Sequence, residues 1–462
     1  MYEGEEKVKV RRDMFCSQPV FRLGMAMMLS CAVAACLTGA SASWASTKSS
    51  AKSPSKFAGP MQEWNWDTAG DNPGAHAVLP DAIKAFQVKY PHVTVVNTSM
   101  SLGEQVDKLP LAFASASSTP MVSQVNQGFS SMGRLVTDGE LLPLNSYAKK
   151  YSWLATIGSA SFQNDSFTSN GKNFGAGNIY AIPSTADEMG IFYNKKLLSE
   201  VGGKTPTSWA GFTQDMRLLH QHGKIAMAFG SGQPSDYNPV NAFDMIANQF
   251  VSAAKGTAWA YHLGAHPSID TAGYITAAKT MQSWAKDGYL SPGYAGLSSA
   301  TAISQFAAGK AGFLIEGNWE DGSVTQLGSN VGFWVPAVTT GGPDEGWAIP
   351  THSSNPALAV AWINEQLVPQ IQMDQLKQGN IPLVKPSAAA LAKVSPLMQE
   401  AVNGWFRDSS RNQVVPFLAD APPSSFLNAQ FSGIQELLAG QSASSVLSSW
   451  QSAYEAYWAN GA

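Results

Sequence analysis

Aromatic, carboxylate and amide side chains stand together where two predicted strands end. Trp66 and Asp67 close the first strand, and Gln124 and Asn126 lie at the end of the third. Open α/β sheets bind ligands at the carboxyl ends of their strands. A tryptophan ring offers a flat apolar face, and carboxyl and amide groups can hold hydroxyls, so this set suits an uncharged, hydroxylated ligand. The alternatives are a ring packed under a helix and an ordinary polar loop. Further polar residues continue the same two loops: Asp71, Asn72 and Gln127.

The carboxylates and histidines do not form a recognisable catalytic or metal-binding set. Asp187 and Glu188 are adjacent, so their side chains diverge, whereas a glycosidase needs two carboxyl groups about 5 to 9.5 Å apart across the bond it breaks. His220 and His222 lack a third metal ligand nearby. No nucleophile-elbow, phosphate-loop or dinucleotide-binding motif occurs. We therefore expect no catalysis, no metal and no cofactor.

Alternating strands and helices must position these residues. β-Branched and aromatic runs predict strands at 63–66, 93–96 and 121–125. Helical spacing predicts helices at 80–90, 109–116 and 131–138. This alternation is typical of an α/β protein with a parallel sheet covered by helices. The C-terminal third is predicted to be mostly helical, at 358–367, 368–378, 396–405, 425–438 and 443–458.

Length and composition indicate a folded protein with two lobes. The chain has 462 residues, of which 44% are hydrophobic and 13% charged, and a single core stops growing at about 250–300 residues. The formal net charge is −4, and no block of Lys and Arg follows residue 22. Because a phosphate backbone requires a basic surface, nucleic acid is not expected as a partner.

The N-terminal segment has the features of an export signal. Basic residues precede an apolar run at 23–37 that is too short for a stable membrane span. Val33-Ala34-Ala35-Cys36 resembles the bacterial lipobox, which predicts a signal peptide at 1–35 and a lipid group on Cys36. Ordinary cleavage after Ala45 is the alternative.

Residues 36–60 are small and polar, which is typical of a flexible linker. A lipid on Cys36 would anchor the protein to the membrane outside the cytoplasm, and without it the protein would be periplasmic. All three cysteines lie at or before Cys36, so the mature chain has no disulfide.

Eight short segments occur in a characteristic order along the chain: Glu63-Trp64-Asn65-Trp66, Phe86 with Pro91, Gly139-Glu140-Leu141-Leu142-Pro143-Leu144, Tyr180-Ala181-Ile182-Pro183, Tyr193-Asn194-Lys195, Pro206-Thr207-Ser208-Trp209, Gly309-Lys310-Ala311 and Gly317-Asn318-Trp319. Taken in this order, they resemble the periplasmic and lipid-anchored sugar-binding proteins of ABC importers, the family of maltose-binding protein. The resemblance covers essentially the whole mature chain. The segment Ser118-Thr119-Pro120-Met121-Val122 departs from the family's usual pattern.

The resemblance implies a two-lobe periplasmic-binding-protein fold with discontinuous lobes and a hinge of several strands. The expected N-terminal lobe combines 61–186 with 317–366, and the C-terminal lobe combines 187–316 with 367–462. The expected crossings lie near 187–192, near 314–319 and near Leu367. Such a hinge permits rigid-body closure of the lobes around a ligand.

The resemblance also implies ligand-binding residues outside the first strand ends. It places a stacking aromatic at Trp319, a sugar-binding carboxylate at Asp187 with Glu188 as the next choice, and an aromatic at Tyr237. The structural alternatives are a core ring for Trp319 and a solvated or ion-paired carboxylate for Asp187.

Two further candidates come from their position in the chain. Glu316 directly precedes Gly317 and is a possible hydroxyl acceptor. Trp347 follows a run of Gly, Pro and acidic residues at 341–346 that predicts a flexible loop, where a large exposed aromatic suggests a ligand contact.

The sequence therefore predicts a substrate-binding component of an ABC importer, which captures a neutral carbohydrate between its lobes and delivers it to a membrane permease. We expect a monomer. The segments chosen for the cleft contain almost no Lys or Arg, which argues against an anionic ligand. The alternatives are a receptor for another solute such as a glycerophosphodiester, polyol or polyamine, a scaffold lipoprotein, and a sugar-acting hydrolase or lyase.

Overall fold

The computed structural model describes residues 57–459 except 172, 234–236, 265–266, 345 and 423. The predicted signal peptide, Cys36 and the predicted linker up to residue 56 lie outside the described residues. The linker prediction is wrong at its end, because Gly59 and Pro60 pair with Val93 and Thr94 as the start of β1 (Gly59–Asn65). None of the helices in the described ranges is both long and apolar enough to cross a bilayer.

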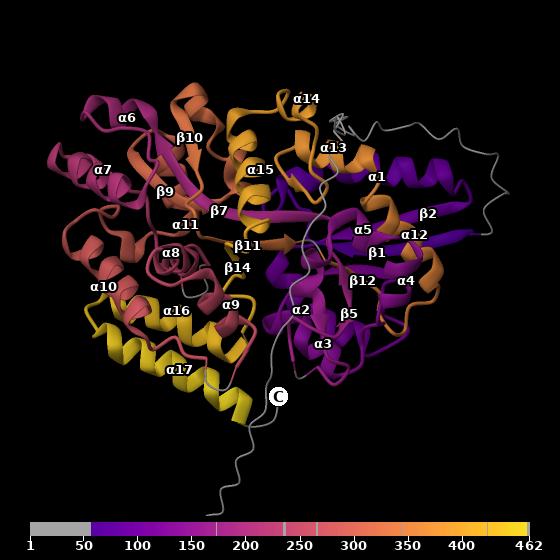
Figure 1. Cartoon of the computed structure of the whole chain (residues 1–462). Coiled ribbons are helices and arrows are strands. Elements are labelled where there is room, and N and C mark those ends of the chain that lie inside the picture. Colours follow the sequence, from indigo (N-terminus) through magenta and orange to yellow (C-terminus); the bar gives the residue numbers. More distant parts are fainter. Residues whose placement is uncertain are drawn as a thin grey trace, which may run out of the picture. The chain divides into compact units, whose positions relative to one another are not determined.

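The first sheet has the strand order β2-β1-β3-β12-β6, and Figure 1 labels its strands β2, β1 and β12. β1 runs parallel to β2 and β3, as predicted, whereas β12 is antiparallel to its neighbours β3 and β6. The other strands of the first sheet, besides β1, are β2 (Val93–Ser99), β3 (Val122–Val125), β6 (Ala181–Ile182) and β12 (Gly346–Ala348). The helices that accompany it in the chain are α1 (Pro73–Lys89), α2 (Leu102–Phe113), α3 (Arg134–Thr137), α4 (Asn145–Lys150), α5 (Trp153–Ile157), α12 (Pro356–Gln366) and α13 (Pro369–Lys377).

The predicted elements of this half are confirmed in type but not in length. The helix predicted from residue 80 begins at Pro73, because Asn72 caps it: its side-chain oxygen accepts a hydrogen bond from the backbone N–H of Ala75 at 3.0 Å. Proline fits the first helical position because its missing N–H would have no partner there. The capping residue Asn72 therefore lies in the loop between β1 and α1, the same loop that contains Trp66.

The second sheet has the order β14-β11-β7-β9-β8, with β10 and β13 also paired to β7. Its strands are β7 (Thr185–Asn194), β8 (Ile225–Met227), β9 (Ala311–Gly317), β10 (Val331–Trp334), β11 (Thr339–Asp344), β13 (Ile381–Pro382) and β14 (Val414–Val415), and a separate pair joins β4 (Ser166–Phe167) to β5 (Asn178–Ile179). The remaining helices are α6 (Lys195–Glu200), α7 (Trp209–Gln221), α8 (Tyr237–Ala247), α9 (Ala253–Ala260), α10 (Ala272–Lys286), α11 (Ser299–Ala307), α14 (Ala388–Leu391), α15 (Pro396–Ser409), α16 (Ser424–Leu438) and α17 (Ala443–Ala459). The helical prediction for the C-terminal third is thus confirmed, and Figure 1 shows α16 and α17 side by side.

Strand pairing places one crossing between the sheets close to its expected position and the other two elsewhere. The first change of sheet, from β6 to β7, comes at 183–184, just before the expected 187–192. The chain does not return near 314–319: β10 and β11 still pair with β7, and the change of sheet comes between β11 and β12. The third crossing follows α13, where β13 joins β7, and not at Leu367.

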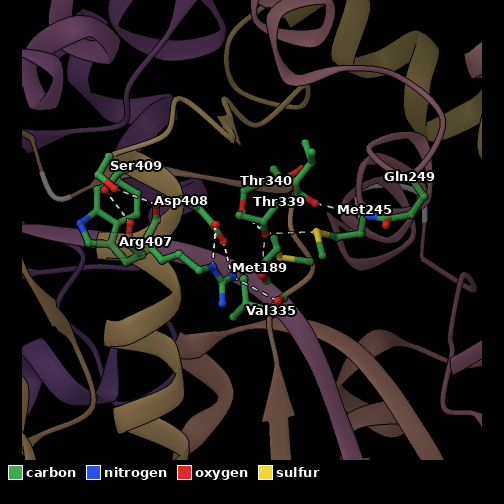
Figure 2. Close-up of polar contacts among 12 residues, drawn as sticks. Met189, Met245, Gln249, Val335, Thr339, Thr340, Arg407, Asp408 and Ser409 are labelled. Carbon is green, nitrogen blue, oxygen red and sulfur yellow. Dashed lines mark hydrogen bonds and ion pairs between the residues drawn. The ribbon is translucent and has the colours of Figure 1, made fainter. Parts of the chain in front are cut away.

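Side-chain contacts fix the crossing strands to helices of the second sheet (Figure 2). The hydroxyl of Thr339 on β11 donates to the carbonyl oxygen of Met189 on β7 at 2.7 Å. Thr340 accepts a hydrogen bond from Asn248 Nδ2 at 2.9 Å. On α15, Arg407 pairs with Asp408 and donates to the carbonyl oxygen of Val335 at 3.2 Å. The first contact ties β11 to β7, the second ties β11 to the residue that follows α8, and the third ties α15 to the residue that follows β10.

Candidate functional site

A cavity of about 360 Å³ lies between the two sheets. Six of the ten predicted ligand-binding residues line it: Trp66, Asn126, Asp187, Tyr237, Glu316 and Trp319. The other lining residues are Asp71, Asn72, Leu102, Gln127, Thr185, Asn238, Asn241, Ser299, Ile303, Glu320, Asp344, Asn380, Phe417 and Asp420. The first-sheet residues come from loops that follow strands, as open α/β sheets favour.

Gln124 and Asp67 support the first-sheet side of the cavity and are not among its lining residues. The side-chain oxygen of Gln124 accepts from the backbone N–H of Trp66 at 3.0 Å, and its Nε2 donates to Asp67 Oδ1 at 3.1 Å. Burial raises the pKa of Asp67 to about 8. These two buried residues hold the loop after β1, so that Trp66 faces the cavity.

Alternation along β7 separates the two adjacent carboxylates that the sequence left as alternatives. Successive side chains of a strand point to opposite faces. Asp187 lines the cavity, whereas Glu188 is fully buried on the side of α15, where a Cβ atom on Gly404 would come within 2.4 Å of its Oε2. Burial and the nearby Asp408 raise the pKa of Glu188 well above its usual value, and Arg407 opposes this. The structure therefore does not bring Glu188 to the cavity.

Trp347 lies in the core and not in an exposed loop. The run predicted to be flexible forms β11 and β12, because Gly341 and Gly342 pair with β7 and Trp347 pairs with β3 and β6. The indole is 2% exposed, donates to Ser184 Oγ at 3.3 Å and packs against Trp362 with ring centroids 5.8 Å apart. The expectation of an exposed aromatic is wrong here.

On the second-sheet side, Glu316 and Trp319 come from the end of β9 and the turn η4 (Asn318–Asp321). Asn238 Nδ2 donates to Glu316 Oε1 at 2.7 Å, which links α8 to β9. A Cβ atom on Gly317 would lie 2.0 Å from the ring of Trp319. Glycine at 317 therefore lets this half-buried indole lie against the strand end and line the cavity.

Further polar and aromatic residues of the lining were not predicted from the sequence, among them Asn241, Asp344, Phe417 and Asp420. Asn241 stands one turn after Asn238 on α8, a helical spacing that places both on one face. Asp344, Phe417 and Asp420 reach the cavity only because β11 and the segment after β14 cross it. Asp420 Oδ1 accepts from Asn126 Nδ2 at 3.1 Å and so joins the two sides of the cavity. Burial raises the pKa of Asp420 to about 7, the amide of Asn126 lowers it and Asp344 raises it further.

A second cavity of about 360 Å³ lies beside Gly341, Gly342 and Pro343, but its lining is chemically different. Its described lining residues include no carboxylate, and its one buried polar pair is used internally, since the Tyr261 hydroxyl donates to Asn164 Oδ1. The first cavity combines rings with many acceptors, which is the composition expected of a site for a hydroxylated ligand.

Within the described residues, no three His, Cys, Asp or Glu side chains are arranged to hold a metal ion. Carboxylate and amide side chains from both sheets line the cavity, which suits a ligand that offers several hydrogen-bond donors.

Comparison with known proteins extends over most of the chain. A family model described as bacterial extracellular solute-binding protein matches residues 81–403. No curated protein matches. A solved chitin oligosaccharide binding protein has a TM-score of 0.73 at 18% identity, over 87% of this chain and 99% of that one.

Two further solved structures have the same fold. The GacH receptor of Streptomyces glaucescens, described without ligand and with acarbose, has a TM-score of 0.66 at 16% identity, over 88% of this chain and 100% of that one. RafE from Streptococcus pneumoniae has a TM-score of 0.65 at 15% identity, over 88% and 99% of the two chains. At these identities the likeness shows a shared fold.

Proposed function

The chain belongs to the bacterial extracellular solute-binding protein family, and from that premise we propose that it captures a carbohydrate in the cavity between its two sheets. Members of this family are exported and act outside the cytoplasm. The cavity carries the proposal: the rings of Trp66, Trp319 and Phe417 lie among carboxylate and amide acceptors. Rings can contact the apolar faces of a sugar while the acceptors take its hydroxyl protons. Similar solved structures include a chitin oligosaccharide binding protein and a receptor in complex with acarbose, which supports a carbohydrate.

A sugar that contacts both sheets would bind a closed form of the protein, in which the two sides of the cavity surround it, more tightly than an open form. Only such a difference in affinity can shift the population of molecules toward the closed form. The closed protein would then dock on the membrane subunits of an ABC importer.

We propose a monomer that leaves its ligand intact, and light scattering together with analysis of the recovered sugar tests both points. Lipid on Cys36 would keep the protein at the membrane, and mass spectrometry of the mature N-terminus tests this assignment.

A thermal-shift screen of the mature protein against monosaccharides, oligosaccharides, polyols and glycerophosphodiesters tests the proposed function. A ligand at a hundredfold excess over its dissociation constant adds about 2.7 kcal/mol of stability, which gives a clear rise in Tm. Binding of a sugar is expected. If only a polyol or a glycerophosphodiester stabilises the protein, the carbohydrate proposal is wrong.

Substitution of Trp319 by alanine tests the site. Loss of the ring should weaken sugar binding by about tenfold or more, because a flat apolar face is removed from the contact. Trp209 is a matched control: it is also half-buried, but it packs against Phe212 and Trp284 away from the cavity. Isothermal titration should show weaker binding for Trp319→Ala and an unchanged affinity for Trp209→Ala. Equal affinities in both variants would place the ligand elsewhere.

A further inference from the structure

The charged residues of the cavity are all of one sign. Six carboxylates line it, and the described lining residues include no Lys, Arg or His. Clefts lined by charge of one sign concentrate ions of the other sign. The six residues are Asp71, Asp187, Glu316, Glu320, Asp344 and Asp420.

Three buried amides of the same wall also present unused acceptors. Gln127, Asn238 and Asn241 are each less than 9% exposed. Gln127 Oε1, Asn238 Oδ1 and Asn241 Oδ1 accept no hydrogen bond from the described residues. A buried acceptor without a donor is destabilising, because it has lost its hydrogen bonds to water and gained none in the protein. The ligand must therefore bring donors to this wall, and this requirement is independent of the charge of the carboxylates.

A lining with carboxylates and no cation also favours a positively charged ligand. Like charges that share a site disfavour each other's ionisation. Burial is the main cause that raises the pKa of Asp420 to about 7, and the nearby Asp344 raises it further. A neutral sugar supplies hydroxyl donors but no charge. A protonated amine supplies up to three donors and one positive charge at the same point.

We propose that the carbohydrate bound in this cavity carries a protonated amino group, so that the ligand class is an amino sugar. This inference rests on the proposed function and narrows its ligand. It departs from the neutral sugar expected from the sequence, because sequence segments show the scarcity of Lys and Arg but not which carboxylates meet in the fold. A single metal ion does not fit, since no three of these carboxylates are arranged around a common point among the described residues.

The test uses sugars that differ only at the amine. Glucose, N-acetylglucosamine and glucosamine form one series, and N,N′-diacetylchitobiose with its fully deacetylated form makes a second, matched pair. Isothermal titration at pH 6.5 and constant ionic strength gives a dissociation constant for each. We expect the free-amine member of a series to bind at least tenfold more tightly than its acetylated or hydroxyl counterpart. Added salt should weaken that preference.

Isosteric removal of charge tests whether the cavity is responsible. Asp187→Asn and Glu316→Gln each keep the shape of the side chain while removing one negative charge. Each should lower the ratio of neutral-sugar to amino-sugar dissociation constants several-fold. Asp287→Asn is the matched control, because Asp287 is exposed at the end of α10 and is not among the residues lining the cavity. Its ratio should equal that of the wild type.

The outcomes separate this inference from the proposed function. If neutral sugars bind as tightly as their amines, or if the two charge variants leave the ratio unchanged, the inference is overturned and sugar binding stands. If spermidine binds and neither kind of sugar does, the carbohydrate function itself is wrong, and the narrower inference falls with it. A preference for the amine that declines in Asp187→Asn and Glu316→Gln, but not in Asp287→Asn, supports both.

Discussion

The carboxyl group of Asp420 connects the two sides of the cavity through its hydrogen bond from Asn126. Three groups on β11 and α8 interact electrostatically with this carboxyl group. Asp344 raises the pKa of Asp420, and Asp420 in turn raises the pKa of Asp244 and of the Tyr237 hydroxyl. Burial raises the pKa of Asp420 to about 7, whereas an aspartate in the unfolded chain titrates near 4. The folded protein therefore keeps a proton that the unfolded chain has already released.

This difference predicts that the ligand-free protein loses stability as the pH rises. Between about pH 4 and 7 the folded state binds more protons than the unfolded state, so the free energy of unfolding falls with pH. The contribution of Asp420 to the free energy of unfolding is fully present below the pKa that this residue has in the unfolded chain. It is lost as the pH rises to the pKa that Asp420 has in the folded protein. Glu63 and Asp67, whose pKa values burial raises to about 7 and about 8, act in the same direction. Urea unfolding of the ligand-free protein at pH 5 and pH 8 should show the lower free energy at pH 8.

Asp420→Asn should make this pH dependence shallower, since it removes one of the protons that the folded state retains. A free energy of unfolding that rises from pH 5 to pH 8 would contradict the assignment of these buried carboxyl groups.

At the scale of strands and helices, local sequence patterns predicted whether a segment forms a strand or a helix better than they predicted where it lies in the fold. The β-branched run that became β2 and the helical spacings of α12, α13, α15, α16 and α17 depend on nearby residues, which the sequence shows directly. The segment at 341–346 was misread because its Gly and Pro residues indicate a turn locally, while pairing with β7 overrides that preference. Alternation separates Asp187 from Glu188, but only the packing of α15 on one face decides which of them meets the ligand. Asp344 and Asp420 carried no local signal at all, since they join the site through crossings far apart in the chain.

The contact between β11 and β7 should be measurable through Thr339. Its buried hydroxyl donates to the carbonyl oxygen of Met189 at 2.7 Å, as Figure 2 shows. Thr339→Val keeps the branched shape but removes this donor, which should lower the free energy of unfolding by about 1–3 kcal/mol. Thr276→Val is the control, because its hydroxyl donates to Ala272 on the exposed face of α10 and its loss should cost less. Equal losses in chemical unfolding of the two variants would show that the strand contact contributes nothing particular.

Across the described chain, the two sides of the cavity also meet beyond the ligand site. The backbone N–H of Phe129 donates to the carbonyl oxygen of Ala421 at 3.2 Å. Gly128 has φ of +81°, and a Cβ atom there would lie 2.2 Å from the carbonyl oxygen of Asp420. The ring of Phe129 packs edge-on against Trp458 of α17, with centroids 5.1 Å apart. We call these contacts the rim, defined by residues 128–129, 420–421 and 458. The rim joins the two sides of the cavity without any ligand.

Trp458→Ala should therefore shift the ligand-free protein toward an open arrangement. The substitution removes the ring that meets Phe129 from the opposite side, while α17 keeps its own packing through Trp450 and Tyr454. Small-angle X-ray scattering should show a larger radius of gyration for the ligand-free variant than for the wild type. A saturating sugar should restore the wild-type value, since ligand contacts on both sheets favour closure. The apparent affinity should fall by the factor by which the closed fraction falls.

Trp209→Ala, which removes a ring packed within one side only, should leave the radius of gyration unchanged. If Trp458→Ala leaves both the radius of gyration and the affinity at their wild-type values, the rim does not control closure, and the ligand alone must bring the two sides together.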